Sequence, residues 1–216
     1  MADFWTRYRR NRASVLGLGI LLTILIMAAT AHLFYPEDPF RLVGRPLSGP
    51  LENGFLLGSD SLGRDVASGI VHGAKTSLLI GLIATLVSIF IGIFFGAFAG
   101  YFGGRIDDLL MRITEIFQTI PSFIFAILLV AIMKPSIVSI VIAIAVVSWP
   151  GVARLVRGEF LSLKNREFVQ ACHTLGMSDL RVMMKEILPN CLSPIIVIGS
   201  LMVATAILIE SGLAFL

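Results

Sequence analysis

Few side chains in this sequence have the type and spacing that catalysis or metal binding requires. His32, His72 and His173 belong to no metal-ligand motif, and Cys172 and Cys191 match no zinc or redox spacing, so we interpret both cysteines as small apolar residues. The sequence contains neither an HExxH nor a GxSxG motif. We therefore expect no catalytic residue and no metal site, and we expect that the chain is not an enzyme.

The segment GIVHGAKT at residues 69–76 has some of the residues of a phosphate-binding loop. Its glycines are not adjacent to Lys75, so the backbone N–H groups and the lysine ammonium group would not converge on one phosphate. We interpret Lys75 as an anchor whose long side chain reaches polar surroundings at the end of an apolar run. No cofactor is therefore expected in this chain.

The composition is that of an integral membrane protein. Of the 216 residues, 56% are hydrophobic and 14% are charged, compared with about 25% charged residues in soluble domains, and the mean hydropathy is +0.91. The net charge of +3 comes from short Lys and Arg clusters beside apolar runs. That pattern is typical of anchoring in a lipid bilayer, so nucleic acid is not an expected partner.

Five apolar stretches are long enough to cross a bilayer as helices, which requires roughly 20 residues each. They cover residues 13–34, 77–100, 116–133, 136–153 and 191–209, and the third helix is expected to begin earlier, near Asp108. The predicted fold class is therefore all-α, a polytopic helical bundle. Pro121 and Pro150 should kink the third and fourth helices, because proline removes a backbone donor.

Small and acidic residues within the apolar runs carry further expectations. Gly92, Gly96 and Gly100 form a row that lets another helix approach closely, either within the chain or from a second subunit. Glu115 and Glu210 lie near the ends of apolar runs, and we interpret both as hydrated side chains at an interface rather than as intramembrane functional groups.

The distribution of basic residues predicts the orientation, because Lys and Arg near span ends are retained in the cytoplasm. If the N-terminus is cytoplasmic, five of the 17 basic residues lie outside and the other twelve inside; the five are Arg41, Arg45, Arg64, Lys75 and Lys134. Residues 1–12 are then cytoplasmic, and residues 35–75 form a partly ordered outer loop. The first run could instead be a cleaved signal peptide, but it exceeds the usual 7 to 15 apolar residues, so we favour an anchor.

A mixed, charged segment, EFVQACHTLGMSDLRVMMKEILPN, interrupts the apolar chain at residues 167–190. Helical spacing predicts one apolar face, made by Phe168, Ala171, Cys172 and Leu175. Gly176 should end this helix, and Ser178 followed by Asp179 should begin a second one. The second apolar face is made by Leu180, Met183, Met184 and Ile187, and Pro189 should end that helix or kink it.

An apolar face on a loop outside the bilayer must be covered. One interpretation is that both faces pack against the protein's own span ends or lie in the lipid interface. The other is that a helix is offered to a groove on a separate protein. The pattern alone leaves both open.

The same segment resembles the EAA loop of type I ATP-binding-cassette importer permeases, which has a Glu-Ala-Ala triplet, a glycine and an Ile-x-Leu-Pro end. Ala171, Gly176, Leu188 and Pro189 match, whereas Gln170 replaces the Glu, Cys172 the second Ala and Glu186 the Ile. Gln170 cannot form the ion pair that the family's Glu is thought to make with the ATPase. The residues that the resemblance assigns to ATPase coupling are Glu167, Gln170, Ala171, Cys172, Leu175, Gly176, Met177, Ser178, Leu188 and Pro189.

Other segments resemble the dipeptide, oligopeptide and nickel branch of these permeases. They are LLGSDSLGRDVASGIVHGAKTSL at 56–78, GYFGGRIDDLLMR at 100–112, SWPGVARLVRGEFLSLKNREFVQA at 148–171 and LPNCLSPIIV at 188–197. The resemblance implies the type I importer transmembrane fold over residues 76–216, with a coupling loop at 158–190. Because that fold has six spans and continues beyond a segment like IESGLAFL, we expect a sixth helix to be missing here.

The resemblance also implies partners and a location. A homologous permease, two ATPases that bind ATP and Mg²⁺, and a periplasmic solute-binding protein would assemble with this chain in a bacterial inner membrane. An ATPase-independent secondary transporter or channel is the alternative, although such proteins usually carry charged groups in mid-span for ion coupling. A membrane scaffold is a third possibility. The sequence assigns neither a solute nor its binding residues.

Overall fold

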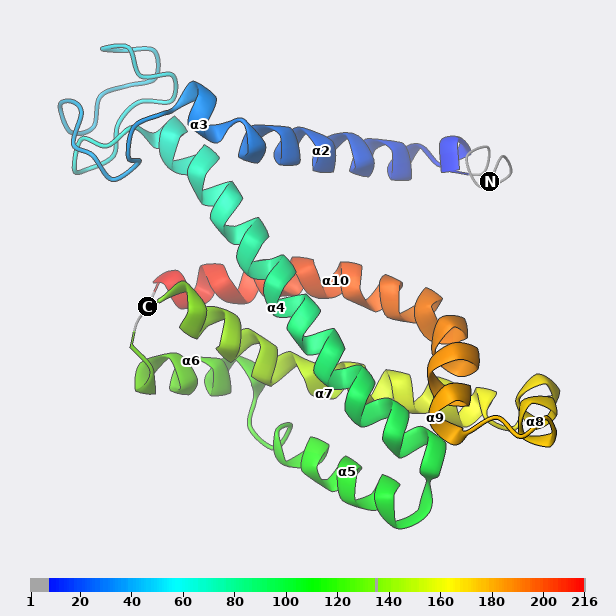
Figure 1. Cartoon of the computed structure of the whole chain (residues 1–216). Coiled ribbons are helices and arrows are strands. Elements are labelled where there is room, and N and C mark those ends of the chain that lie inside the picture. Colours follow the sequence, from blue (N-terminus) through cyan, green and yellow to red (C-terminus); the bar gives the residue numbers. More distant parts are fainter. Residues whose placement is uncertain (1–7, 135, 216) are drawn as a thin grey trace. The chain divides into compact units, whose positions relative to one another are not determined.

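The computed structural model describes residues 8–134 and 136–215, which form helices, turns and one isolated bridge between Ser59 and Asp65. The predicted all-α fold class is confirmed. The elements in chain order (Figure 1) are α2 (Arg12–Ala29), α3 (Ala31–Phe34), α4 (Val66–Phe102), α5 (Gly104–Ile116), α6 (Ser122–Ile132), α7 (Ile137–Leu163), α8 (Glu167–Thr174), α9 (Asp179–Val182), a π-helical turn (Met183–Ile187) and α10 (Leu188–Phe215). The chain forms two compact units, divided between Ser77 and Leu78, which are described separately.

In the first unit, the first apolar run forms a helix that ends earlier than expected. Asn11 caps α2, because its side-chain oxygen accepts a hydrogen bond from the Ala13 N–H at 3.1 Å. Thr30 separates α2 from the short α3, and its hydroxyl group donates to the Ile26 carbonyl at 2.7 Å. The 18 residues of α2 are still long and apolar enough to cross a membrane.

The loop after α3 is ordered by its own polar groups, and it is shorter than expected. The Ser59 hydroxyl donates to the Arg45 carbonyl at 2.6 Å and accepts from the Ser48 N–H at 2.9 Å. The expected loop of residues 35–75 ends at Asp65, whose carboxylate accepts from the Ala67 N–H at 2.9 Å and so caps α4. Residues 66–75, the last ten of the expected loop, are therefore helical. Aspartate is a preferred N-cap residue, so Asp65 could have indicated this helix start.

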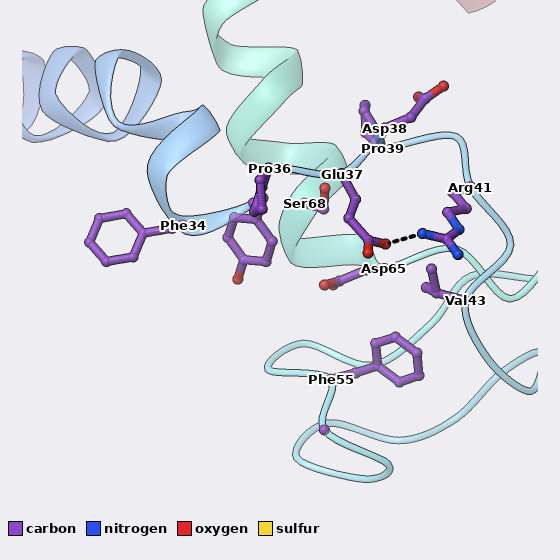
Figure 2. Close-up of a pocket in the computed structure, with 12 residues that line it drawn as sticks. Phe34, Pro36, Glu37, Asp38, Pro39, Arg41, Val43, Phe55, Asp65 and Ser68 are labelled. Atoms are coloured by element: carbon purple, nitrogen blue, oxygen red, sulfur yellow. Dashed lines mark ion pairs between the residues drawn. The ribbon is translucent and has the colours of Figure 1, made fainter.

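A cavity of about 330 Å³ within this unit is lined by Phe34, Tyr35 and Phe55 and by the acidic residues Glu37, Asp38 and Asp65 (Figure 2). Those carboxylates hold the loop together. Glu37 pairs with Arg41 at 2.9 Å, and Asp38 accepts from the Phe40 N–H at 2.9 Å. Since Asp65 caps α4, each acidic group at this cavity has a structural partner, and the cavity is a consequence of how the loop folds.

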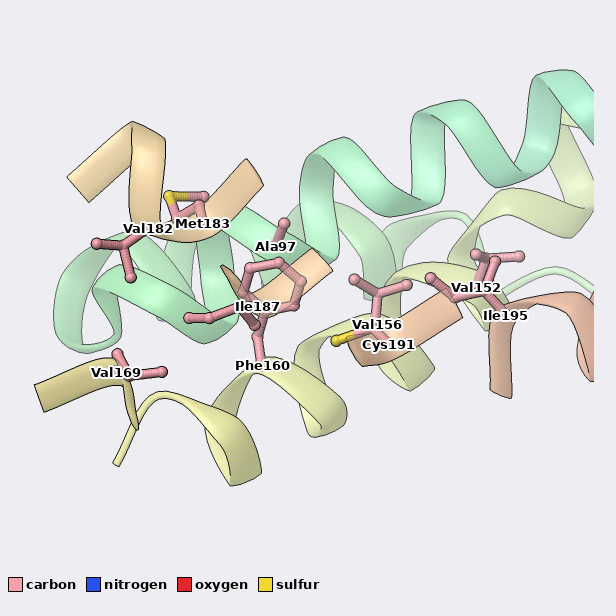
Figure 3. Packing of buried hydrophobic residues seen from close by; sticks show 10 residues of the cluster. All are labelled: Ala97, Val152, Val156, Phe160, Val169, Val182, Met183, Ile187, Cys191 and Ile195. Carbon is pink, nitrogen blue, oxygen red and sulfur yellow. The ribbon is translucent and has the colours of Figure 1, made fainter. Parts of the chain in front are cut away.

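The second unit is organised around α7, which packs against α5, α6 and α10 (Figure 1). Two clusters of buried apolar side chains fill it. Cluster A (Figure 3) joins α4, α7, α8, α9 and α10, and its members are Ala97, Val152, Val156, Phe160, Val169, Val182, Met183, Ile187, Cys191 and Ile195. Cluster B joins α4, α6, α7 and α10, and its members are Ile80, Ala84, Ala126, Ala143, Ile144, Val147, Ala206 and Leu213. The burial of Cys191 agrees with its interpretation as an apolar residue.

The third expected span, residues 116–133, is divided rather than kinked. The helix stops at Ile116, and α6 begins at Ser122 with Pro121 in extended backbone conformation, φ −53° and ψ 128°. Proline also disfavours helical geometry in the residue before it, so the chain leaves the helix over residues 117–121. Four helices in the described residues are long and apolar enough to cross a membrane, and the 11-residue α6 is shorter. By contrast, α7 continues through Pro150.

The glycine row packs within the chain, which settles the alternative that the sequence left open. A Cβ atom on Gly96 would lie 2.8 Å from Val156 Cβ and 3.0 Å from the Arg157 nitrogen, and one on Gly100 would lie 2.6 Å from Phe160 Cβ. Only hydrogen at these positions lets the backbone of α4 lie directly against α7.

We predict that Gly96→Ala destabilises the second unit by about 1–3 kcal/mol, because the added methyl group has no space between α4 and α7. The matched control is Gly158→Ala in α7, where nothing lies within 4 Å of an added Cβ. Thermal unfolding in detergent, followed by circular dichroism, should show a lower midpoint for Gly96→Ala than for Gly158→Ala. Equal midpoints would contradict the close packing.

The turn at residues 60–64, in the loop after α3, should open in acid. The Arg64 N–H donates to Asp60 Oδ1 at 2.8 Å and the Leu62 N–H does so at 2.9 Å, and these bonds hold the pKa of Asp60 below its ordinary value of 3.8. A lowered carboxylate pKa stabilises the folded turn above pH 3.8, and this stabilisation is lost as the pH falls through the folded-state pKa. After correction for the intrinsic exchange rate, the Arg64 amide should lose its protection against hydrogen exchange only below pH 3.8. Asp60→Asn keeps an acceptor oxygen and should remove this pH dependence.

Candidate functional site

Residues 167–187, called the corner segment below, leave α7 and return to the bundle through a sharp change of direction. The segment consists of α8, a connection at residues 175–178, α9 and the π-helical turn. Gly176 makes the corner with φ +77°, a left-handed conformation that favours glycine. The Gly176 N–H donates to the His173 carbonyl at 2.9 Å and the Met177 N–H donates to the Cys172 carbonyl at 3.1 Å, so the last carbonyls of α8 are satisfied. The predicted helix end at Gly176 is confirmed.

The apolar face predicted for the first helix is divided between two environments. Val169, which the sequence analysis did not include, is completely buried, and Cys172 is half-buried against cluster A. Phe168 and Ala171 are exposed, and Leu175 retains 82% of its accessible surface. The apolar arc of α8 is thus wider than the strip that the bundle can cover, so one edge packs inward and the other faces outward.

The second predicted face is divided in the same way. Met183 and Ile187 are buried in cluster A together with Val182, whereas Leu180 is 62% exposed and Met184 is 53% exposed. Four exposed apolar side chains therefore remain on the corner segment, and they are Phe168, Leu175, Leu180 and Met184.

The predicted second helix does not end at Pro189. Helix α9 has only four residues, and it continues through the π-helical turn into α10, so the chain is helical from Asp179 to Phe215. A π turn widens the backbone just before Pro189, where a regular turn would bring the proline ring against a carbonyl group. Figure 1 shows the chain changing direction between α9 and α10, so the alternative expectation of a kink is confirmed.

Of the other residues assigned by resemblance, some face the bundle and some are exposed. Met177 and Leu188 pack against cluster A. Gln170 is exposed and donates from Nε2 to the Asn165 carbonyl at 3.3 Å. The remaining exposed members are Glu167, Gly176, Ser178 and Pro189. The structure thus places eight of the ten predicted residues in the corner segment and Leu188 and Pro189 at the start of α10. The segment has an inner face that anchors it and an outer face that is accessible.

Two polar contacts beside this segment were not predicted. Arg157 on α7 forms two hydrogen bonds with the largely buried carboxylate of Asp107 on α5, from Nε at 2.5 Å and from Nη2 at 2.6 Å. Tyr101 near the end of α4 contacts His173 and Asp179. The partners in both contacts lie at least 50 positions apart in the chain. For Asp107 and Arg157, the sequence offered one indication: the two opposite charges lie near helix ends that the predicted topology places on the cytoplasmic side.

The two acidic residues interpreted as hydrated differ. Glu115 is exposed and lines a polar cavity of about 510 Å³ between α5 and α7 with Arg112, as expected. Glu210 is only 8% exposed in α10, so the interpretation of Glu210 as a hydrated side chain is wrong. A longer helix than the expected span, reaching Phe215, places Glu210 inside the bundle rather than at its edge.

Comparison with known proteins identifies the family. Residues 92–216, which include the corner segment and cluster A, match the family described as the inner membrane component of binding-protein-dependent transport systems. Residues 1–47 match the N-terminal transmembrane domain of oligopeptide transport permease C. The chain belongs to this permease family. Its resemblance to ATP-binding-cassette importer permeases, recognised from the sequence, is thereby confirmed.

Relatives of this permease are similar over nearly the whole chain. The dipeptide transport system permease protein DppC of Bacillus subtilis is 39% identical over 99% of this chain and 67% of its own length. The di/tripeptide transport system permease protein DppC of Pseudomonas aeruginosa is 39% identical over 100% of this chain and 73% of its own. The oligopeptide transport system permease protein OppC of Escherichia coli is 41% identical over 99% of this chain and 72% of its own length.

The division of the corner segment into two faces can be tested with one residue from each face. We predict that Val169→Asp destabilises the attachment of α8 by about 3–5 kcal/mol, because the carboxylate would be buried without a partner. Leu175→Asp adds the same group on the outer face of the segment, where Leu175 is 82% exposed, and should change stability by less than about 0.5 kcal/mol. Limited proteolysis in detergent should show faster cleavage within residues 164–190 for the Val169 variant alone.

Proposed function

We propose that this permease is a membrane-spanning subunit of an ATP-driven importer and that the corner segment is its docking surface for an ATPase. The supporting observation is the two-sided corner segment. Its inner face is anchored in cluster A, while Phe168, Leu175, Leu180 and Met184 remain exposed on its outer face. A short amphipathic helix with such a face fits a groove on another protein.

The packing of the inner face explains how docking would move the membrane helices. Val169, Val182 and Ile187 belong to the same buried cluster as Val156 and Phe160 of α7 and Ile195 of α10 (Figure 3). Protein interiors are densely packed, so a displacement of the corner segment shifts its neighbours rather than being absorbed in empty space. Closure of the ATPases would thus be transmitted to α7 and α10.

Energy transfer through this surface requires different contacts in different nucleotide states. If the corner segment bound the open and closed forms of the ATPases equally well, ATP would shift no conformational equilibrium of the permease. In this family the expected charged contact comes from a Glu at the position of Gln170, which is uncharged and exposed here. Docking in this chain would therefore depend on the apolar side chains more than on an ion pair.

The cargo in this proposal is a peptide, since the printed names of the relatives are those of dipeptide, di/tripeptide and oligopeptide transport permeases. A periplasmic binding protein would deliver it to the outer face, and a second, homologous permease would complete the pathway. The ATPases would bind ATP and Mg²⁺, so this chain itself would carry no cofactor. The excess of Lys and Arg on the side of the N-terminus supports a cytoplasmic N-terminus in a bacterial inner membrane.

We predict that Leu175→Glu weakens the association with the ATPase subunits by about 30-fold, corresponding to about 2 kcal/mol, because a charge replaces a central apolar contact. Leu42→Glu is the matched control, since Leu42 is also well exposed but lies in the loop of the first unit. Both variants should insert into membranes normally. Co-purification of the ATPases from detergent measures the difference, and full retention by Leu175→Glu would refute the proposed docking surface.

A further inference from the structure

The end of α4 holds the corner segment by polar contacts in addition to cluster A, against which Tyr101 also packs. The phenol group of Tyr101 donates a hydrogen bond to Asp179 Oδ1 at 2.7 Å, and its oxygen lies 3.3 Å from His173 Nε2. His173 lies in the last turn of α8, and Asp179 is the first residue of α9. One hydroxyl group therefore contacts the segment on both sides of its corner.

The chemistry of a phenol suits this double contact. A hydroxyl group has one proton to donate and lone pairs to accept, so Tyr101 can give its proton to the Asp179 carboxylate and accept one from the Nε2–H tautomer of His173. His173 Nδ1 also lies 4.0 Å from Asp179 Oδ1. Phenylalanine would keep the ring but could make neither hydrogen bond.

The corner is open at Gly176. A Cβ atom on Gly176 would meet nothing within 4 Å, so no atom packs against the corner at this position. Helix α8 has eight residues, and helices of this length are marginal unless tertiary contacts hold them. Within α8, the contacts with cluster A are made by Val169 and Cys172. They hold α8 along one side, and the contact of Tyr101 with His173 adds a polar connection in its last turn.

Tyr101 is itself well placed to transmit a force. It lies in the last turn of α4, and the Lys164 ammonium group donates to the Tyr101 carbonyl at 3.4 Å from the end of α7. One helical turn before Tyr101, Ala97 belongs to cluster A, and Gly96 and Gly100 pack against α7. Movement of the corner segment that pulls on the phenol group would therefore act on α4.

We propose that Tyr101 is a positioning residue that couples the corner segment to the end of α4, so that motion imposed by the ATPases reaches this helix through a hydrogen bond as well as through apolar packing. The inference rests on the proposed function. It adds a polar connection to the apolar contacts of cluster A, which include Ala97 of α4. Asp179 and His173 act in it as the two attachment points on the corner segment.

The test compares Tyr101→Phe with the unaltered chain in the assembled transporter in lipid nanodiscs. Hydrogen exchange is measured with and without ATP trapped by vanadate, at residues 167–182 and at residues 97–103. In the unaltered complex both segments should respond to the nucleotide. In Tyr101→Phe the response at residues 97–103 should fall by about fivefold, the equivalent of one typical hydrogen bond, while that at residues 167–182 persists.

Three further variants separate the hydrogen bond from general structural effects. Asp179→Asn keeps an acceptor oxygen and should preserve the response of α4, whereas Asp179→Leu should lose it. Tyr8→Phe removes a phenol group that donates to the Ser14 carbonyl at 2.7 Å in the first unit, and it should change nothing at residues 97–103. Because the side chains of His173 and Asp179 are 43% and 59% exposed, water can replace the lost bond, and Tyr101→Phe should fold normally.

The outcomes distinguish this inference from the proposed function. An unchanged response of α4 in Tyr101→Phe, or no response of α4 in the unaltered complex, would overturn the coupling role of Tyr101 alone. Loss of the ATPases from Tyr101→Phe would also overturn it, because Tyr101 would then belong to the docking surface. Failure of the unaltered chain to retain any ATPase would overturn the proposed function, and the coupling role with it.

Discussion

The close approach of α4 to α7 is the constraint on which the second unit depends. With hydrogen atoms alone at Gly92, Gly96 and Gly100, the two backbones lie in direct contact over this stretch. Lipid provides little hydrophobic driving force between helices, so this fit supplies much of the attraction that holds them together. It also determines which residues lie beside the ends of α4 and α7, where Lys164 contacts the Tyr101 carbonyl and Tyr101 contacts the corner segment.

A partly buried ion pair adds direction to this packing. The guanidinium group of Arg157 and the carboxylate of Asp107 form two parallel hydrogen bonds, which fix the orientation of α5 relative to α7 more narrowly than apolar contacts could. Such a pair contributes little net stability because both groups lose hydration, but breaking it leaves a buried charge. We therefore regard it as a determinant of geometry: it sets where α5 begins after the turn at Gly103.

Much of the architecture could be predicted from the sequence, because apolar run length and helix-ending residues report directly on local structure. The corner at Gly176 and the start of α9 after Ser178 are examples, since a left-handed glycine and a serine before a helix act within a few residues. Local sequence does not determine which face of a helix packs against the bundle. Periodicity grouped Phe168 with Leu175 correctly, but only the position of cluster A determines that Val169 packs inward. Contacts such as Tyr101 with Asp179 depend on the same long-range placement.

The interruption between α5 and α6 has a consequence for what surrounds the permease. At 1.5 Å per residue, the 11 residues of α6 extend about 16 Å, roughly half of a 30 Å hydrocarbon layer. If the chain crosses the bilayer at α6, the non-helical backbone of residues 117–121 therefore lies within the hydrocarbon layer. Acyl chains offer no hydrogen-bond partner, so any of these peptide groups without a partner in the chain would need water or protein beside it. Gln118, Thr119 and Ile120 are all exposed in the single chain, so an interruption at this depth would make the surface around them unfavourable for lipid.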